Sequence, residues 1–295
     1  MKLCNSIRLI SAALLIILTI IVGAGLLTWI LLRPEKEVYP ILKGPEILSG
    51  DGIKLKAIQN TNHNSHRWVI LVHSYRSDHS MMNEFARIYR EKGYNTLQPD
   101  NRAHGSSSGD FIGMGFYDAS DILKWIDYIA EIDPNAEIIL HGISMGAAAL
   151  LILSDNTLLP ENVKVIIEDS GYSSAMDYVS YKLKSKAGFR LRLIPELMSW
   201  FADWAAGYSL KEASSLEHVG KSRIPILFIH GKKDSTVPVE DAYSLFEEAA
   251  CTKELYICKD AGHGQSAFID PETYWDKVFL FIDTNIDKKV KVNKR

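Results

Sequence analysis

The stretch Glu137-Ile138-Ile139-Leu140-His141-Gly142-Ile143-Ser144-Met145-Gly146, which leads into the apolar run Ala147–Leu153, decides the fold. Its first residues are typical of a buried strand, and the run that follows is typical of a buried helix. Gly142 and Gly146 flank Ser144 symmetrically and leave room for a strained backbone and for close packing of helix on strand. A serine hydroxyl becomes a good nucleophile when such a turn exposes it and a base removes its proton. The stretch therefore predicts a strand–turn–helix unit of an α/β fold, with Ser144 as the nucleophile at its apex.

Two further apolar strands each end in a loop that carries a candidate partner for Ser144. The strand Pro225–His230 precedes Asp234, and the strand Glu254–Cys258 precedes His263. Because the carboxyl ends of parallel strands meet at one edge of a sheet, we expect the three side chains to lie close together. We predict that His263 is the base that takes the serine proton and that Asp234 orients its imidazole.

Other residues compete for the roles of base and acid. Four histidines lie at strand ends or in a tight turn, and we expect them to be structural side chains bonded to local backbone: His73, His104, His141 and His230. Asp169 also follows a strand, Val163–Glu168, and stands as the alternative acid. Asp234 is favoured because it lies in the loop that begins Gly-Lys-Lys-Asp.

Together these segments resemble the α/β-hydrolase superfamily from Pro45 to Ile286. Trp68–Tyr75 resembles the third strand of that fold with its oxyanion loop, and Pro99–Gly105 resembles the Asp-x-Arg-Gly-His-Gly turn after the fourth strand. Within the superfamily the chain is similar to bacterial membrane-anchored hydrolases that are called prolyl-oligopeptidase-like or acylaminoacyl-peptidase-like.

The resemblance implies an oxyanion hole beside the nucleophile. Its donors would be the backbone N–H of Met145, the residue after the nucleophile, and that of Tyr75, with Ser74 as the less favoured alternative. The phenol of Tyr75 is either a further donor or a wall of the pocket. Ser74 and Ala103 stand where many relatives carry glycine, and neither belongs to the triad. The mechanism needs no cofactor and no metal.

The rest of the chain alternates strand and helix patterns, which predicts a mostly parallel twisted sheet with helices on both faces. Strands are expected at Lys54–Ile58, Val69–His73, Asn95–Gln98, Ile138–His141, Val163–Glu168, Ile226–His230 and Leu255–Cys258. Helices are expected at Met81–Lys92, Phe116–Ile132, Met145–Ser154, Val239–Ala249 and Tyr274–Ile286.

Residues 170–222 interrupt this alternation and are rich in large apolar side chains. They include Tyr178, Tyr181, Phe189, Leu193, Ile194, Leu197, Met198, Trp200, Phe201 and Trp204. One interpretation is a helical lid over the nucleophile, whose inner face contacts an apolar part of the substrate. The other is a helix that packs an aromatic stripe into the core, and the two are compatible.

The amino-terminal segment predicts a membrane anchor. From Leu9 to Leu32 there is no charged residue, and at 1.5 Å per residue this run would span roughly 30 Å of hydrocarbon with some to spare. A cleavable signal peptide has an apolar region of about 7–15 residues, so this run is too long for one. Because positive charges lie on both sides of it, the orientation signal is slight. We expect the amino terminus inside and the catalytic domain outside the membrane.

These segments divide the chain into a tail at 1–8, an anchor at 9–32, a linker at 33–44, a hydrolase domain at 45–287 and a basic tail at 288–295. The composition, with 47% hydrophobic and 23% charged residues and a net charge of −3, is that of a globular protein. Lys288–Arg295 is the longest basic stretch, so nucleic acid is not an expected partner. Cys251 and Cys258 bracket a predicted strand and would lie about 23 Å apart, too far for a disulfide.

The complete triad favours a hydrolase of carboxylic esters with a small, partly apolar substrate. No propeller domain is present in the sequence to restrict access to peptides, and a peptidase acting on short or acylated peptides is the second hypothesis. The third is a non-catalytic, membrane-bound binding protein that keeps the fold. Such a protein would normally lack a triad member, whereas Ser144, Asp234 and His263 are all present.

Overall fold

The computed structural model describes residues 2–34, 42–62, 64–189 and 191–292 of the 295-residue chain. Within those residues one sheet has eight strands in the order β1-β2-β4-β3-β5-β6-β7-β8. The strands are β1 (Glu46–Leu48), β2 (Lys54–Asn60), β3 (Arg67–Val72), β4 (Asn95–Pro99), β5 (Glu137–Ile143), β6 (Val163–Asp169), β7 (Ile226–Gly231) and β8 (Lys253–Cys258). Neighbours from β4 to β8 pair in parallel, whereas β1 and β2 join the sheet antiparallel.

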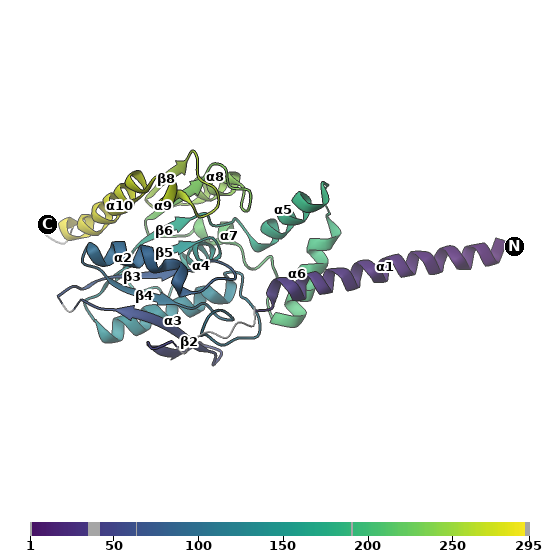
Figure 1. Cartoon of the computed structure of the whole chain (residues 1–295), viewed down its shortest axis with the longest axis horizontal. Helices are drawn as coiled ribbons and strands as arrows, with labels where there is room; N and C mark the ends of the chain where they lie inside the picture. The colour runs from purple at the N-terminus through teal and green to yellow at the C-terminus, as the bar shows by residue number, and fades with distance from the viewer. Residues whose placement is uncertain (1, 35–41, 63, 190, 293–295) are drawn as a thin grey trace.

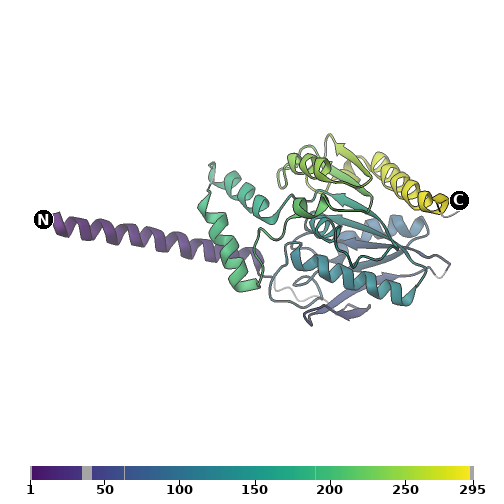
Figure 2. The same ribbon diagram turned by 180° about the vertical axis from the view of Figure 1, so that it is seen from behind.

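Helices cover both faces of this sheet, as Figures 1 and 2 show from opposite sides. Alternate residues of one strand point to opposite faces, so β3 sends Ile70 into one apolar cluster and Leu71 into the other. The first face is covered by α3 (Phe116–Ile132), α4 (Met145–Leu153), α7 (Ser215–Val219) and α8 (Val239–Glu248). The second is covered by α2 (Asn83–Glu91), α9 (Ser266–Ile269) and α10 (Pro271–Val292), with the short helix η1 (His79–Met82) before α2.

Three helices lie apart from these two layers. Helix α1 (Lys2–Leu32) projects away from the domain, and its carboxyl-terminal part lies against α6 (Leu193–Ala206) (Figure 1). Helix α5 (Ala175–Ala187) precedes α6, and the two form a hairpin on the side of the domain from which α1 emerges (Figure 2). Among the described residues, one helix, Asn5–Leu32, is long and apolar enough to cross a membrane.

The predicted architecture, a mostly parallel sheet with helices on both faces, is confirmed. The structure adds β1, which was not expected because three partly exposed residues give no apolar run. The last helix was expected to end at Ile286, and that boundary was wrong, since the backbone stays helical to Val292. The segment 170–222 contains α5, α6 and α7. Residues 35–41 of the predicted linker and 293–295 of the predicted tail lie outside the described residues.

Candidate active site

Ser144 occupies the turn between β5 and α4 in a strained conformation. Its φ is +56° and its ψ is −115°, which residues with a side chain rarely adopt. The turn is possible because glycines flank it: a Cβ at Gly146 would lie 2.3 Å from the carbonyl oxygen of Val72 on β3. A Cβ at Gly142 would lie 2.6 Å from the carbonyl carbon of Gly146. The two glycines therefore let α4 start directly against the sheet, with the serine at the end of β5.

The structure brings Ser144, His263 and Asp234 together in one line of hydrogen bonds. His263 Nδ1 lies 2.6 Å from Asp234 Oδ2, and His263 Nε2 lies 2.8 Å from Ser144 Oγ. A carboxylate can only accept, so Nδ1 carries the ring proton and Nε2 is left to accept from the serine hydroxyl. Each of the three residues follows the carboxyl end of a different strand, β5, β7 or β8, as the sequence predicts.

Asp234 is held ionised by the groups around it. Its Oδ1 accepts hydrogen bonds from the backbone N–H of Thr236 and of Val237, at 2.7 and 2.9 Å. Burial alone would raise the pKa of this carboxyl, but hydrogen bonds from His230 and His263 outweigh burial and hold the pKa well below its usual range. The carboxylate is thus fixed in position and in charge before any substrate binds.

His230 is a second histidine on the same carboxylate, a role that the sequence reasoning missed. Its Nε2 lies 3.2 Å from Asp234 Oδ2 and 3.1 Å from the carbonyl oxygen of Val237. Both partners only accept, so Nε2 carries a proton. Burial lowers the pKa of His230, but the hydrogen bond to Asp234 acts in the opposite direction, and the net shift of this pKa is upward. The spacing His-Gly-Lys-Lys-Asp is the one signal in the sequence that could have suggested the pair.

Glu168 lies on β6 beside β7, which carries His230, and is fully buried. Burial raises its pKa to about 8, so the side chain is neutral at neutral pH. Its Oε1 accepts a hydrogen bond from the backbone N–H of Gly171. Within the described chain, Glu168 Oε2 and His230 Nδ1 are two buried polar atoms without a hydrogen-bond partner.

Asp169, the alternative acid, bonds to other groups. Its Oδ1 accepts from the Ser170 hydroxyl at 2.8 Å, and its Oδ2 accepts from the Tyr274 hydroxyl at 3.0 Å. The Ser170 hydroxyl oxygen in turn accepts from the backbone N–H of Gly264, at 3.1 Å, next to His263. Asp169 therefore braces the loop that carries the histidine, while Asp234 makes the bond to the imidazole.

The two predicted oxyanion donors lie on different elements around Ser144. Met145 is the first residue of α4, where backbone N–H groups have no acceptor within their own helix. Tyr75 lies in the loop after β3, and its phenol donates to the carbonyl oxygen of Leu31 on α1 at 2.7 Å. The phenol of Tyr75 is thus engaged with the amino-terminal helix.

Two of the competing histidines fix this loop. His73 Nδ1 donates to the carbonyl oxygen of Ser74, and its Nε2 accepts from the backbone N–H of Asn101. His104 Nε2 accepts from the backbone N–H of Arg76, at 3.0 Å. Burial lowers the pKa of His73 to about 4, so this ring stays neutral. Both are structural, as expected, whereas His141 bonds to the hydroxyls of two tyrosines rather than to backbone.

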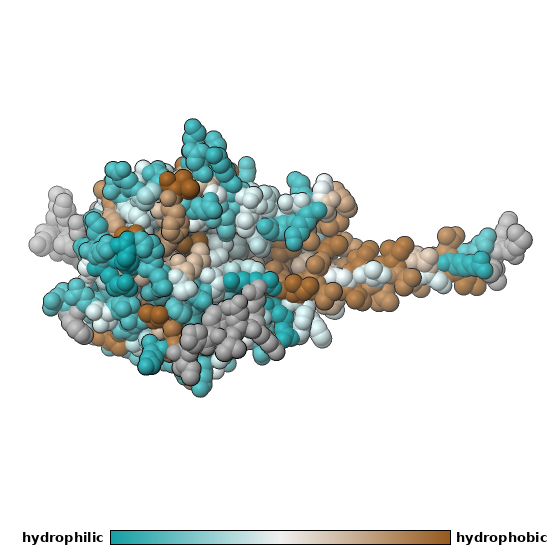
Figure 3. Space-filling model, viewed as in Figure 1, coloured by the Kyte–Doolittle hydropathy of each residue, from teal (hydrophilic) through white to brown (hydrophobic). Residues whose placement is uncertain are grey.

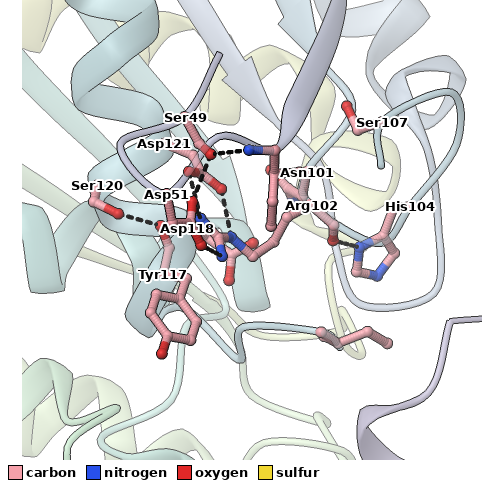
Figure 4. A network of polar contacts seen from close by, with 12 residues as sticks. Ser49, Asp51, Asn101, Arg102, His104, Ser107, Tyr117, Asp118, Ser120 and Asp121 are labelled. Atoms are coloured by element: carbon pink, nitrogen blue, oxygen red, sulfur yellow. Dashed lines mark hydrogen bonds and ion pairs between the residues drawn. The ribbon is translucent and has the colours of Figure 1, made fainter. Parts of the chain in front are cut away.

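A buried ion pair supports the turn that carries His104 (Figure 4). The guanidinium of Arg102 donates two hydrogen bonds to Asp121 on α3, at 2.6 and 2.7 Å, and two to Asp51 in the β1–β2 turn, at 3.0 and 3.2 Å. His104 Nδ1 bonds to the carbonyl oxygen of Arg102 at 2.8 Å. The network therefore links three elements to the oxyanion loop.

The described residues hold no group of three or more histidine, cysteine, aspartate or glutamate side chains arranged to bind a metal ion. Cys251 and Cys258 are unpaired in the same part of the chain. The arrangement around Ser144 is suited to nucleophilic attack by an activated serine, with the side chains present supplying base and acid.

Comparison with known proteins agrees with this geometry. The alpha/beta hydrolase family matches residues 69–277. Protein YqkD of Bacillus subtilis (strain 168) is 28% identical over 244 residues, which cover 82% of this chain and 79% of YqkD. The AB hydrolase superfamily protein YisY of the same organism is 23% identical over 232 residues, covering 67% of this chain and 85% of YisY.

Solved structures share the fold, and an esterase is among them. An esterase of Pyrococcus furiosus, Pf2001, superposes with a TM-score of 0.69 at 22% identity, over 85% of this chain and 99% of that chain. Est1E of Butyrivibrio proteoclasticus with bound ferulic acid superposes with a TM-score of 0.64 at 20% identity, over 83% of this chain and all of the other (100%).

Proposed function

Because the chain belongs to the alpha/beta hydrolase family, we propose that it is a serine hydrolase that cleaves carboxylic esters through an acyl-enzyme. The line of hydrogen bonds from Asp234 through His263 to Ser144 carries this proposal. The esterases among structures of the same fold support ester over amide cleavage. We also propose that, within this family, the chain is one of the membrane-anchored prolyl-oligopeptidase-like hydrolases.

The proposed reaction has two halves. In the first, Ser144 Oγ attacks the ester carbonyl carbon while His263 Nε2 takes the hydroxyl proton, and the resulting imidazolium is stabilised by Asp234. The bond from the carbonyl carbon to the alkoxy oxygen then breaks, and His263 gives its proton to the departing alcohol. In the second half, His263 takes a proton from water, whose oxygen attacks the acyl-enzyme. The bond from the acyl carbon to Ser144 Oγ then breaks, and His263 returns its proton to Oγ. The products are a carboxylic acid and an alcohol.

We propose that the backbone N–H groups of Met145 and Tyr75 stabilise the negative charge on the carbonyl oxygen during both halves. Removal of one such donor typically lowers the rate by about 10²–10³. The hydrogen bonds that fix the oxyanion loop, from His73 and to His104, support this assignment, because a donor of this kind acts only when it is held in place.

We also propose that α1 anchors the enzyme in a membrane, with the catalytic domain on the outer side. The length and apolar character of Asn5–Leu32 support an anchor. Added protease should digest the domain in intact cells, and protection until the cells are lysed would reverse the proposed orientation.

Fluorophosphonate labelling of the full chain tests the catalytic proposal. We expect a label on Ser144, located by mass spectrometry, that disappears in Ser144→Ala and His263→Ala. His66→Ala is a matched control, because His66 also bonds an aspartate, Asp133, at 2.7 Å but lies on the surface. This variant should label normally. A folded wild-type protein that neither labels nor hydrolyses an activated ester would instead favour a non-catalytic binding protein, and faster amide than ester cleavage would favour a peptidase.

A further inference from the structure

Helix α1 contacts helix α6 through small residues. Ala24 and Thr28 are buried, and Thr28 Oγ1 donates to the carbonyl oxygen of Met198 on α6, at 3.2 Å. At Gly25 a Cβ would lie 3.2 Å from the ring of Phe201, so the absence of a side chain there lets the two helices approach closely. The buried residues of α1 lie in its carboxyl-terminal third, and residues 5–19 of the helix are exposed.

The position of this contact along α1 fixes its depth in a membrane. Arg8 is the last charged residue before the apolar run, and from Leu9 to Thr28 the helix rises about 30 Å, the thickness of a bilayer's hydrocarbon core. Helix α6 contacts α1 at Gly25 and Thr28. The contact therefore lies at the boundary of the hydrocarbon core that is nearer the domain. Since α6 crosses α1 steeply in both views, it would lie roughly along the membrane plane (Figures 1 and 2).

The outward face of α6 suits such a position. Leu193, Trp200 and Trp204 are 61%, 59% and 77% exposed, and their spacing places them on one side of the helix. Neither interpretation of residues 170–222 from sequence, a core stripe or the inner face of a lid, accounts for two exposed tryptophans. Tryptophan is enriched where membranes meet water. Figure 3 shows the apolar surface of α1 continuing onto the side of the domain from which it emerges.

Basic side chains surround the tip of the α5–α6 hairpin. Lys184, Lys186 and Arg192 are exposed on either side of Phe189, which is itself 62% exposed. The chain as a whole has a net charge of −3, so this concentration of positive charge is local. Basic residues beside exposed aromatic rings are the pattern of surfaces that bind anionic lipid headgroups.

The oxyanion loop touches the same end of α1. Besides the bond from Tyr75 to Leu31, Arg76 Nη2 donates to the carbonyl oxygen of Ile30 at 2.5 Å. An apolar groove between α1 and α6, lined in part by Gly25, Trp29 and Trp204, lies in this region. The oxyanion loop is thus bonded to the carboxyl-terminal end of the helix that is proposed to cross the membrane.

We propose that the α5–α6 hairpin rests on the bilayer, with Trp200 and Trp204 in the interfacial layer and the lysines on anionic headgroups, and that the substrate is an amphiphilic carboxylic ester drawn from that bilayer. The substrate class rests on the ester hydrolysis proposed above. The position of the hairpin on the bilayer does not depend on that proposal. It is argued from the contact between α1 and α6, the depth of this contact along α1, the exposed tryptophans of α6 and the basic residues at the hairpin tip.

Depth-dependent quenching tests the seating on the full chain. An environment-sensitive dye is attached at Trp204→Cys, in a background where Cys4 and Cys251 are serine, and the protein is placed in phosphatidylcholine vesicles with added phosphatidylglycerol. Leu15→Cys on exposed α1 serves as the membrane control, and Leu158→Cys, an exposed leucine of the domain, as the water control. We expect spin-labelled lipids to quench the dye at 204 and at 15 but not at 158. A dye at 204 that behaves like the one at 158 would overturn the proposal.

Paired substrates test the source of the ester. Methylumbelliferyl acetate is hydrolysed from solution, and methylumbelliferyl oleate is presented in the same vesicles with the same leaving group. For Trp200→Gln with Trp204→Gln, and for Lys184→Glu with Lys186→Glu, we expect a loss of about fivefold or more on the oleate and little change on the acetate. The pair Lys54→Glu with Lys124→Glu makes the same charge change on exposed lysines elsewhere and should leave both rates unchanged.

The outcomes separate the two proposals. No hydrolysis of either ester by the wild type, with the dye at 204 quenched, would remove the esterase proposal and keep the seating. Equal rates of the variants and the wild type on both esters would overturn the bilayer as the source of substrate.

Discussion

The carboxyl edge of the sheet and the contact between α1 and α6 are built by opposite means. Around Ser144, buried polar groups are joined by short hydrogen bonds, and glycines let backbone meet backbone. At the second region, small residues meet rings, and large apolar side chains such as Trp204 stay exposed. The difference fits the two proposed roles, because catalysis requires atoms fixed to a fraction of an ångström, whereas contact with a membrane requires only an apolar surface at the depth of the interface.

The largest effect should come from the acid of the triad. Asp234→Asn leaves the site almost unchanged in shape but favours the wrong imidazole tautomer, and kcat for an activated ester should fall by about 10⁴. Asp169→Asn keeps one acceptor for Ser170 or Tyr274, and its kcat should stay within about tenfold of the wild type. If the two variants rank the other way, the acid is Asp169.

Substitution of glycine by alanine compares the tight turn at Ser144 with a position on α1 that makes no close contact. Gly146→Ala places a methyl group against the carbonyl oxygen of Val72 and should lower the free energy of unfolding by about 3 kcal/mol, with loss of activity. Gly23→Ala on α1 meets no described atom within 4 Å and should leave both quantities unchanged. Urea unfolding in detergent micelles measures the free energy of unfolding of both variants. Equal values for the two variants would contradict the close packing at Ser144.

Stability should depend on pH through the buried carboxyl behind the triad. A pKa raised to about 8 means that folded Glu168 holds its proton more tightly than the unfolded chain does. Its contribution is complete below the unfolded value of about 4.3 and is lost as the pH rises towards 8. The raised pKa of His230 acts in the same direction, because its contribution is also lost as the pH rises.

Glu168→Gln should therefore flatten the profile. Between pH 5 and pH 8 the wild type should lose about 3.5 kcal/mol more stability than the variant, which keeps an oxygen for the N–H of Gly171. Unfolding curves at several pH values measure the slope. Parallel slopes would mean that Glu168 is ionised in the folded protein.

The smallest effect is expected where the two regions meet. Tyr75→Phe removes the hydrogen bond to Leu31 but keeps the ring and the backbone N–H, and it should lower stability by about 1 kcal/mol. Activity on a soluble ester should stay within a few-fold of the wild type, as measured by kcat. A loss of 10² or more would assign the phenol itself to the oxyanion hole.

The assembly of the proposed triad was predictable because its residues lie next to strand ends in the sequence. Ser144, Asp234 and His263 each follow an apolar run, and parallel strands bring such loops together without further information. The bond between His230 and Asp234 was not predictable, since it depends on which way a buried ring turns inside one loop.

The contact of α1 with α6 could not be predicted from the sequence. Helix α6 is apolar on more than one side, so its pattern does not say which face is buried and which is exposed. Its partner residues on α1 are far away in the chain, as the bond from Thr28 to Met198 shows. Strand β1 was missed for a local reason, because three residues carry too little pattern.

Helix α1 ends against the domain, and its last carbonyl groups accept hydrogen bonds from residues of the domain. Ile30, Leu31 and Leu32 accept hydrogen bonds from Arg76, Tyr75 and Ile112. These hydrogen bonds fix the orientation of α1 relative to the domain, so the domain does not rotate freely about the end of the helix. A chain cut after residue 33 would take these acceptors from the oxyanion loop and uncover α6, so the shortened protein should differ from the full chain in both stability and kinetics.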